Sequence, residues 1–310
     1  MKLSIVTTMY RSAPYLLEFY GRVGAAAKTI TDDYEIVFVN DGSPDDSLEI
    51  ALKLYRQDAR IRIVDLSRNF GHHKAIMTGL AHARGDLVFL LDCDLEEDPE
   101  VLERFSETMM ATGADVVYGV QGKRAGGFFT RYSGGLFYSL FNLLSSHPVP
   151  RNVLTARLMT KRYVANLVQH RDRELFLLGL LAITGFEQVP VICPKHPKGT
   201  SVYTLPRKIA LFVNAITSFS NTPLVAIFYL GCAISVVSTI AAAYLVARWL
   251  FQGLLLAGWA SLIVSVWLMG GMTILCLGII GIYLSKVFIE TKERPYTVIR
   301  QIYYRQQEER

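Results

Sequence analysis

The chain has 310 residues, 51% of them hydrophobic, and its mean hydropathy of +0.29 exceeds that of an ordinary soluble protein. The net charge of +5 at pH 7 is modest and gives no case for nucleic-acid binding. The four cysteines lack metal-ligand or Cys-x-x-Cys spacing, which favours reduced thiols in a cytoplasmic protein.

The first 120 residues alternate short apolar runs with amphipathic segments. We predict strands at 3–9, 35–41, 60–66, 87–94 and 115–120, and helices at about 15–28, 46–56, 73–83 and 99–112. Strands that alternate with helices of about ten to fifteen residues indicate βαβ units and a doubly wound α/β sheet. No Gly-x-Gly-x-x-Gly motif follows the first strand, which argues against a dinucleotide-binding dehydrogenase. The N-terminus passes directly into a strand, without the apolar core or cleavage site of a signal peptide.

In the stretch "LVFLLDCDLEEDPE", residues 87–100, an apolar run is followed by five carboxylates within residues 92–98. The run is typical of a strand buried on both faces in a parallel sheet, and ligands bind at the carboxyl ends of such strands. A divalent ion there takes oxygens from one or two carboxylates and from substrate phosphates, which makes Asp92 and Asp94 candidate ligands. The alternative is a helix start, with Asp98 as the N-cap and Pro99 at the first helical position. Both interpretations can hold together.

Polar residues also follow the other predicted strands. Thr8 and Tyr10 follow the first, Asn40-Asp41-Gly42-Ser43 the second, and Ser67-Arg68-Asn69 the third. Asp41 can accept hydrogen bonds from a nucleoside, and a metal on Asp94 can hold its diphosphate, so the set suggests a nucleotide bound through a divalent ion. For "NDGS" a plain turn is the alternative, because these residues favour turns.

The strands of residues 121–204 have no clear pattern; a glycine-rich turn lies at Gly126-Gly127, and a helix is predicted near 130–144. In residues 205–221 the apolar side chains fall on one helical face, at Leu205, Ile209, Phe212, Val213, Ile216 and Phe219. This spacing predicts an amphipathic helix in a membrane interface, with a core helix of the soluble domain as the alternative.

Residues 224–247 and 260–285 contain no charge. Each run exceeds the roughly 20 helical residues needed to cross a bilayer, and two in tandem favour membrane spans over buried core helices. The flanking cations predict that both ends face the cytoplasm: Arg207 and Lys208 precede the first span, Lys286, Lys292 and Arg294 follow the second, and Arg248 lies between. We therefore expect a multi-pass protein of the inner (cytoplasmic) membrane with its catalytic domain in the cytoplasm.

The order of "SIVTTMY", "VNDGS", "SRNFGHHKAIMTGLAHARGD" and "DCDLEEDPE" resembles the glycosyltransferase family 2 domain. With the two spans, the chain looks like a polyprenyl-phosphate glycosyltransferase of the dolichyl-phosphate mannose synthase type. The resemblance implies a GT-A domain at 1–204, an interfacial helix at 205–221, two spans within 222–286 and a basic cytoplasmic tail at 287–310. It also implies an inverting, Mg²⁺- or Mn²⁺-dependent transfer of one sugar from a UDP- or GDP-linked donor to a polyprenyl phosphate, with undecaprenyl phosphate as the expected acceptor. A homo-oligomer is compatible with it.

Site residues follow from the same resemblance. Asp92, Asp94 and Glu96 fall at the metal positions, and the first two also count as catalytic. Donor-binding positions correspond to Thr8, Tyr10, Val39, Asp41, Arg68, Cys93 and Arg124. Candidates for holding the acceptor phosphate are Arg131, Arg157, His196 and Lys198; for each, a solvated surface cation is the alternative.

The sequence also departs from the family pattern. Thr8 stands for proline, Arg11 and Ser12 for asparagine and an acid, and Glu96 for glutamine. In the acceptor and sugar region, Thr155 stands for an acid, and His196 and Val202 for arginine and lysine. The identity of the sugar therefore does not follow from the resemblance. Two other functions stay open: a membrane-anchored nucleotide-binding protein without catalysis, and a processive polysaccharide synthase, which should carry more spans and a Gln-x-x-Arg-Trp motif that is absent.

Overall fold

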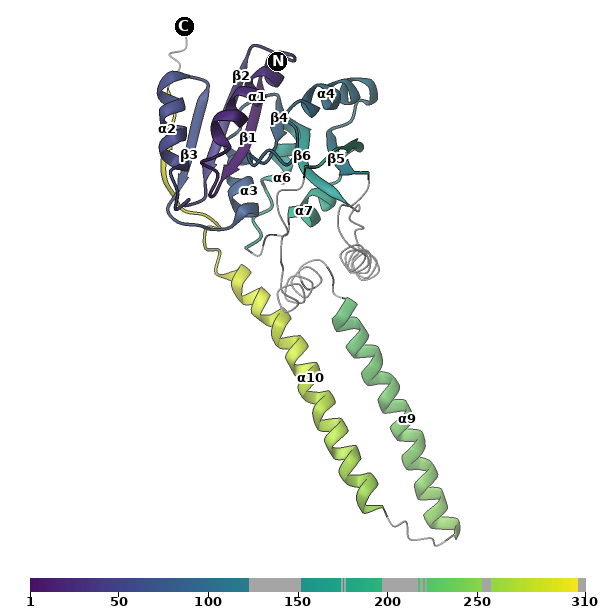
Figure 1. Ribbon diagram of the computed structural model, residues 1–310. Helices are drawn as coiled ribbons and strands as arrows, with labels where there is room; N and C mark the ends of the chain where they lie inside the picture. The colour runs from purple at the N-terminus through teal and green to yellow at the C-terminus, as the bar shows by residue number, and fades with distance from the viewer. Residues whose placement is uncertain are drawn as a thin grey trace. The chain divides into compact units, whose positions relative to one another are not determined.

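The computed structural model describes residues 1–122, 152–173, 175, 177–196, 217, 220, 222–252 and 258–305 (Figure 1). The chain divides into two compact units. The first comprises residues 1–139, 147–204 and 294–310, and the second comprises residues 140–146 and 205–293. The first unit carries all the strands of the described residues, and the second carries two long helices.

The first unit contains an eight-stranded mixed sheet in the order β7-β5-β6-β4-β1-β2-β3-β8. Its central strands are parallel to one another: β1 (Leu3–Met9), β2 (Tyr34–Asn40), β3 (Ile61–Leu66) and β4 (Leu87–Leu90). Every residue of β1, β2 and β3 is buried, which explains why most of their residues are apolar. The parallel half predicted from the sequence is confirmed.

The other half of the sheet breaks the parallel pattern. Its strands are β5 (Val116–Gln121), β6 (Val153–Thr160) and β7 (Gln188–Cys193). Strand β6 runs antiparallel to both β4 and β5, whereas β7 is parallel to β5. Strands β6 and β7 lie within residues 121–204, where no strand could be predicted from the pattern of apolar residues.

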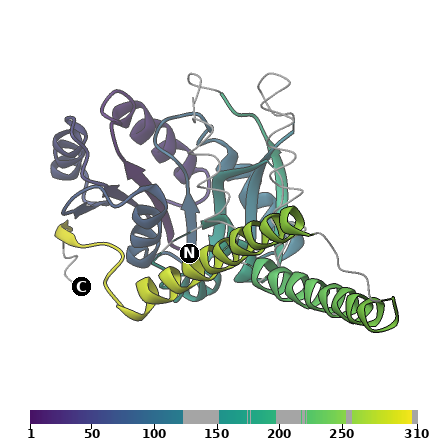
Figure 2. The same cartoon turned by 90° about the horizontal axis from the view of Figure 1, so that it is seen from below.

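Two layers of helices cover the sheet (Figure 1 and Figure 2). One layer holds α1 (Leu16–Lys28), α2 (Ser47–Gln57) and α4 (Val101–Thr112), and the other holds α3 (His72–His82) and α6 (Lys161–Leu167); α7 (Leu177–Ile183) follows α6 in the chain. Aromatic pairs join helix to strand, because Phe19 meets Phe38 and Phe89 meets Phe105 at ring distances of 6.3 Å. The ends of the four helices predicted in residues 1–120 lie within two residues of the observed ends of α1, α2, α3 and α4.

The start of α4 corrects one interpretation. The helix begins at Val101, and its N-cap is Glu100, without a capping side-chain hydrogen bond. Asp98 does not cap the helix with its side chain; it accepts a hydrogen bond from Arg22 Nη2 at 2.8 Å instead. An arginine partner satisfies the carboxylate more strongly than a backbone N–H does.

A final strand, β8 (Ile299–Tyr303), pairs antiparallel with β3. This strand was not predicted, because residues 287–310 were expected to form a basic tail. Side chains strengthen the pairing: Arg300 Nη1 lies 3.3 Å from Oδ2 of the buried Asp65, and the Thr297 and Thr78 hydroxyls lie 2.9 Å apart. After the two long helices, the chain therefore returns to the first unit and closes the edge of its sheet.

The second unit contains α9 (Thr222–Gln252) and α10 (Trp259–Thr291). Within them, Thr222–Ala241 and Ser265–Thr291 are apolar and long enough to cross a membrane, with mean hydropathies of 2.2 and 2.1. In both segments, none of the most apolar stretch is buried against the rest of the described protein. Core helices of a soluble domain would be largely buried, so these are candidate membrane spans. The predicted helices at 130–144 and 205–221 lie outside the described residues, apart from positions 217 and 220.

Candidate active site

The carboxyl ends of the parallel strands bring the predicted donor residues to one edge of the sheet. Backbone pairing sets the ends of the strands side by side, because Asp41 N donates to Met9 O and Leu91 N donates to Val6 O. Thr8, Asp41 and Asp92 therefore meet at the ends of β1, β2 and β4. This edge is where open α/β sheets bind their ligands.

Asp41 is buried and fastens the loop between β3 and α3. Its carboxylate accepts hydrogen bonds from Phe70 N at 2.7 Å and from Gly71 N at 3.0 Å. Burial raises the pKa of Asp41, although these two backbone groups favour the charged form. A carboxylate has about four acceptor positions, so two remain for a ligand such as a nucleoside.

The Asp41 loop packs tightly through Gly42, whose φ is +60°. A Cβ atom there would lie 2.5 Å from Arg68 C and Asn69 N. Only glycine fits, since it tolerates the left-handed conformation and has no atom to clash. The loops that follow β2 and β3 are therefore held in direct backbone contact.

We expect Gly42→Ala to weaken nucleotide binding about tenfold or more, because the two loops must separate to admit a methyl group. Gly113→Ala is the matched control, since Gly113 has a φ of +71° but no atom within 4 Å of a Cβ. It should lower the free energy of unfolding by about 1 kcal/mol and leave nucleotide affinity unchanged. Titration of both variants with UDP and GDP measures this. Wild-type affinity in Gly42→Ala would show that the loop contact does not shape the site.

The acids that follow β4 have several partners. Asp94 Oδ1 accepts a hydrogen bond from Glu96 N at 3.0 Å, and Glu96 Oε2 lies 2.9 Å from Lys195 Nζ. Burial, together with the charges of Asp92 and Glu96, raises the pKa of Asp94. Crowded carboxylates of this kind favour a neutralising cation.

His72, the first residue of α3, contacts residues at the ends of both β1 and β4. Its Nδ1 is 3.1 Å from Thr8 Oγ1, and its Nε2 is 3.4 Å from Asp92 Oδ1. That Asp92 oxygen is buried and has no hydrogen-bond partner among the described residues. A buried carboxylate oxygen without a hydrogen-bond donor is costly unless a cation reaches it.

A divalent ion fits Asp92 and Asp94. Both offer carboxylate oxygens, the ligands that Mg²⁺ and Mn²⁺ prefer, and within the described residues the buried Oδ1 of Asp92 accepts no hydrogen bond, its contact with His72 being 3.4 Å long. Among the described residues, no three His, Cys, Asp or Glu side chains already form a metal site. Glu96, the third predicted ligand, pairs with Lys195, and its role stays a prediction.

The other predicted donor residues divide by exposure. Val39 is fully buried in β2, and the buried Cys93 donates its thiol to Thr8 O at 3.0 Å. Burial raises the pKa of Cys93 to about 12, so the thiol stays protonated. Tyr10 and Arg68 are exposed, and the Arg68 guanidinium stacks on Phe70 at 4.2 Å. Of these four residues, Tyr10 and Arg68 present their side chains at the surface.

Two predicted acceptor residues lie near the acids and already have protein partners. Arg157 is buried and donates to Thr155 O and Leu154 O at 3.0 and 2.9 Å. His196 Nε2 lies 3.1 Å from Asp98 Oδ2. Their binding of an acceptor phosphate stays a prediction. Arg124, Arg131 and Lys198 lie outside the described residues.

Glu97 also lies among the acids that follow β4, although it is not one of the predicted site residues. It is buried and accepts hydrogen bonds from Thr155 N at 3.1 Å and Ala156 N at 2.6 Å. Burial is the main cause that raises the pKa of Glu97 to about 7. Glu97 thus ties the acid loop to β6 at Thr155, one of the positions that departs from the family pattern. Its place among five carboxylates gave no signal that it alone would be buried.

Comparisons with known proteins show that this chain is similar to glycosyltransferases. A family model described as "Glycosyl transferase family 2" matches residues 4–167. A protein of Mycobacterium tuberculosis (strain CDC 1551 / Oshkosh) that carries a glycosyltransferase name is 58% identical over 98% of this chain and 89% of its own. The bactoprenol glucosyl transferase of Shigella phage SfV is 32% identical over 97% of this chain and 98% of its own. A prophage bactoprenol glucosyl transferase homolog of Escherichia coli (strain K12) is 31% identical over 97% and 99%.

Proposed function

Because this chain belongs to glycosyltransferase family 2 and has the mixed α/β sheet of a GT-A enzyme, we propose that it transfers one sugar from a nucleotide sugar to a polyprenyl phosphate. The reaction inverts the anomeric centre and takes place at the cytoplasmic face of the inner membrane. Undecaprenyl phosphate is the proposed acceptor, and the donor is UDP- or GDP-linked.

The observation that carries the proposal is the meeting of Thr8, Asp41 and Asp92 at the carboxyl edge of the sheet. The adjoining acids suit a diphosphate bound with a divalent ion. The acceptor half is supported by two candidate membrane spans and by near full-length similarity to relatives named as bactoprenol glucosyl transferases. A membrane-anchored nucleotide-binding protein without catalysis would share both features, and a transfer assay separates the two functions.

In the proposed reaction, Asp41 and the loop it fastens hold the nucleoside, and Asp92 and Asp94 hold the ion. When bound, the ion stabilises the negative charge that develops on the departing diphosphate. The acceptor phosphate is already anionic, since phosphate monoesters have a second pKa of about 6. No strong general base is therefore required. The predicted acceptor cations, Arg131, Arg157, His196 and Lys198, need only hold that phosphate in line with the sugar.

Membranes that contain the protein, supplied with undecaprenyl phosphate and a panel of labelled nucleotide sugars, test the proposal. One donor should pass its label into the organic phase, and EDTA should stop the transfer. Nucleotide binding without any labelled lipid, across the whole panel, would favour the non-catalytic alternative. Label in a long polymer would favour a polysaccharide synthase.

We also expect both ends of the chain to face the cytoplasm, because Lys and Arg flank the outer ends of the two apolar segments. A single cysteine placed by Gly253→Cys should react with an impermeant thiol reagent only from the opposite side to one placed by Gln306→Cys. A background in which Cys93, Cys193, Cys232 and Cys276 are replaced by serine is the control. Labelling of both positions from the same side would contradict the two-span topology.

A further inference from the structure

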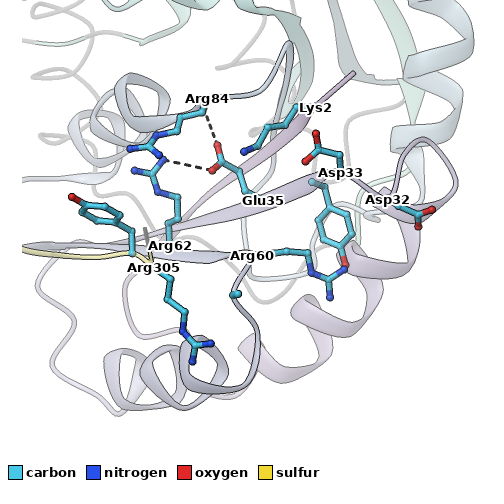
Figure 3. A pocket seen from close by; sticks show the side chains of 11 residues that line it. Lys2, Asp32, Asp33, Glu35, Arg60, Arg62, Arg84 and Arg305 are labelled. Atoms are coloured by element: carbon cyan, nitrogen blue, oxygen red, sulfur yellow. Dashed lines mark hydrogen bonds and ion pairs between the residues drawn. The ribbon is translucent and has the colours of Figure 1, made fainter. Parts of the chain in front are cut away.

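A pocket lies at the edge of the sheet opposite to the acids that follow β4. It has a volume of about 620 Å³ and is formed at the amino ends of the parallel strands, with the end of β8 as one wall (Figure 3). Glu35 lines it, six residues before Asp41 along β2, which corresponds to about 20 Å at the rise of an extended strand. We call it the amino-edge pocket. It is separate from the candidate active site.

The amino-edge pocket carries an excess of two positive charges, because five lining side chains are cationic and three are acidic. The charges are also segregated, since Asp32 and Asp33 lie on the side away from Arg62 and Arg84 (Figure 3). Arg60, which also lines the pocket, is neutralised by Asp58 at 2.9 Å. The cationic half is therefore formed by Arg62, Arg84 and Arg305, and its only acid is Glu35.

The fold holds this cationic half in place. Glu35 is buried; it accepts hydrogen bonds from Ser4 Oγ at 2.6 Å and from Arg84 N at 2.8 Å, and its Oε2 lies 3.5 Å from Arg62 Nη1. The same Arg62 nitrogen donates to His82 O at 2.9 Å. One carboxylate thus offsets the buried Arg62 and leaves the charges of Arg84 and Arg305 to face the pocket. Burial lowers the pKa of Arg62, and the charge of Arg84 lowers it further, while Glu35 opposes both.

Tyr304 sets the spacing of the cations. Its ring lies 5.7 Å from the Arg62 guanidinium carbon and 5.8 Å from that of Arg84. Within the described part of the chain, the Arg84 side chain has no hydrogen bond to a protein acceptor, and Arg305 uses only Nη2, toward Arg56 O. Several guanidinium N–H groups are thus available, and their planar fork matches the oxygens of a phosphate.

We propose that the amino-edge pocket binds a phosphate-bearing anion through Arg62, Arg84 and Arg305. The volume lies within the range of about 300–1,000 Å³ found for small-molecule sites. The same chemistry can come from a free oligophosphate or from a lipid headgroup. Since Tyr304 and Arg305 follow α10 in the chain, the site exists only when the last strand is in place. The proposal does not depend on the proposed function.

Calorimetric titration of the full-length protein, in nanodiscs of neutral lipid with inorganic diphosphate as the probe, tests the first source. EDTA is present throughout, so that diphosphate cannot bind at the acids through a metal ion. We expect the double variant Arg84→Gln/Arg305→Gln to bind about tenfold more weakly or worse. Lys53→Gln removes an exposed cation outside the pocket and should bind as the wild type does. Arg84→Lys, which keeps the charge but loses the fork, should fall between them.

Co-sedimentation with vesicles of phosphatidylglycerol and phosphatidylcholine tests the second source. A loss of sedimentation in the double variant but not in Lys53→Gln would identify a lipid headgroup as the ligand. Thermal unfolding of each variant confirms that the exposed substitutions leave the domain folded. The proposal is overturned if the wild type binds neither probe, or if the folded double variant binds both as the wild type does. Neither arm measures sugar transfer.

Discussion

Asp94→Ala is expected to abolish sugar transfer, with a loss of about a thousandfold or more, because a carboxylate that holds the ion contributes several kcal/mol to the transition state. The variant should still fold. Burial raises the pKa of Asp94, so the folded protein holds this carboxylate at a cost at neutral pH, and its removal relieves that cost.

Glu103→Ala is the matched control, since Glu103 is an exposed acid on α4 and is not one of the predicted site residues. It should retain wild-type turnover. Transfer assays with Mg²⁺ and Mn²⁺ varied, combined with thermal unfolding, separate the outcomes. Normal turnover by a well-expressed Asp94→Ala protein would remove the metal hypothesis. Failure to fold in Asp94→Ala, with Glu103→Ala intact, would instead assign Asp94 a structural role.

The second large effect is a separation of the two substrates. Asp41→Ala should raise the KM for the nucleotide sugar about tenfold or more and hardly change the KM for polyprenyl phosphate. Part of this loss comes from Phe70 N and Gly71 N, which lose their shared acceptor. Asp41→Asn keeps one acceptor oxygen and should show a smaller increase.

Arg131→Ala should do the reverse, with a similar increase in the KM for polyprenyl phosphate and little change for the donor, because an acceptor contact contributes little to donor binding. Initial rates with each substrate varied in turn measure both constants. If Arg131→Ala weakened only the donor, the assignment of the acceptor side would be wrong.

The strands and helices of residues 1–120 were predictable because β1, β2 and β3 are buried on both faces and are therefore largely apolar, in contrast to the amphipathic helices between them. Strand β8 was not. Its sequence, "IRQIY", is short, polar and partly exposed, and it pairs only because β3 offers an open edge. A strand that depends on a distant partner leaves little signal in its own residues.

The candidate site divides in the same way. Strand ends and carboxylate spacing located Asp41, Asp92 and Asp94 from the sequence alone. The pairs Glu97 with Thr155 and Glu96 with Lys195 were not predictable, because 58 and 99 residues separate the partners and only the folded sheet brings them together. The burial of Arg157 and its hydrogen bonds to backbone carbonyls were not predictable either, because only the folded sheet shows that its guanidinium lies in the interior.

The mass of the lipid product tests the central claim most directly. Purified full-length protein in nanodiscs is incubated with undecaprenyl phosphate, Mg²⁺ and the nucleotide sugar that the membrane assay selects, and the lipid fraction is analysed by mass spectrometry. We predict one new species, heavier than undecaprenyl phosphate by a single sugar residue, that is absent with Asp94→Ala. Unchanged lipid alongside a consumed donor, or a ladder of several sugar residues, would contradict single transfer to a polyprenyl phosphate.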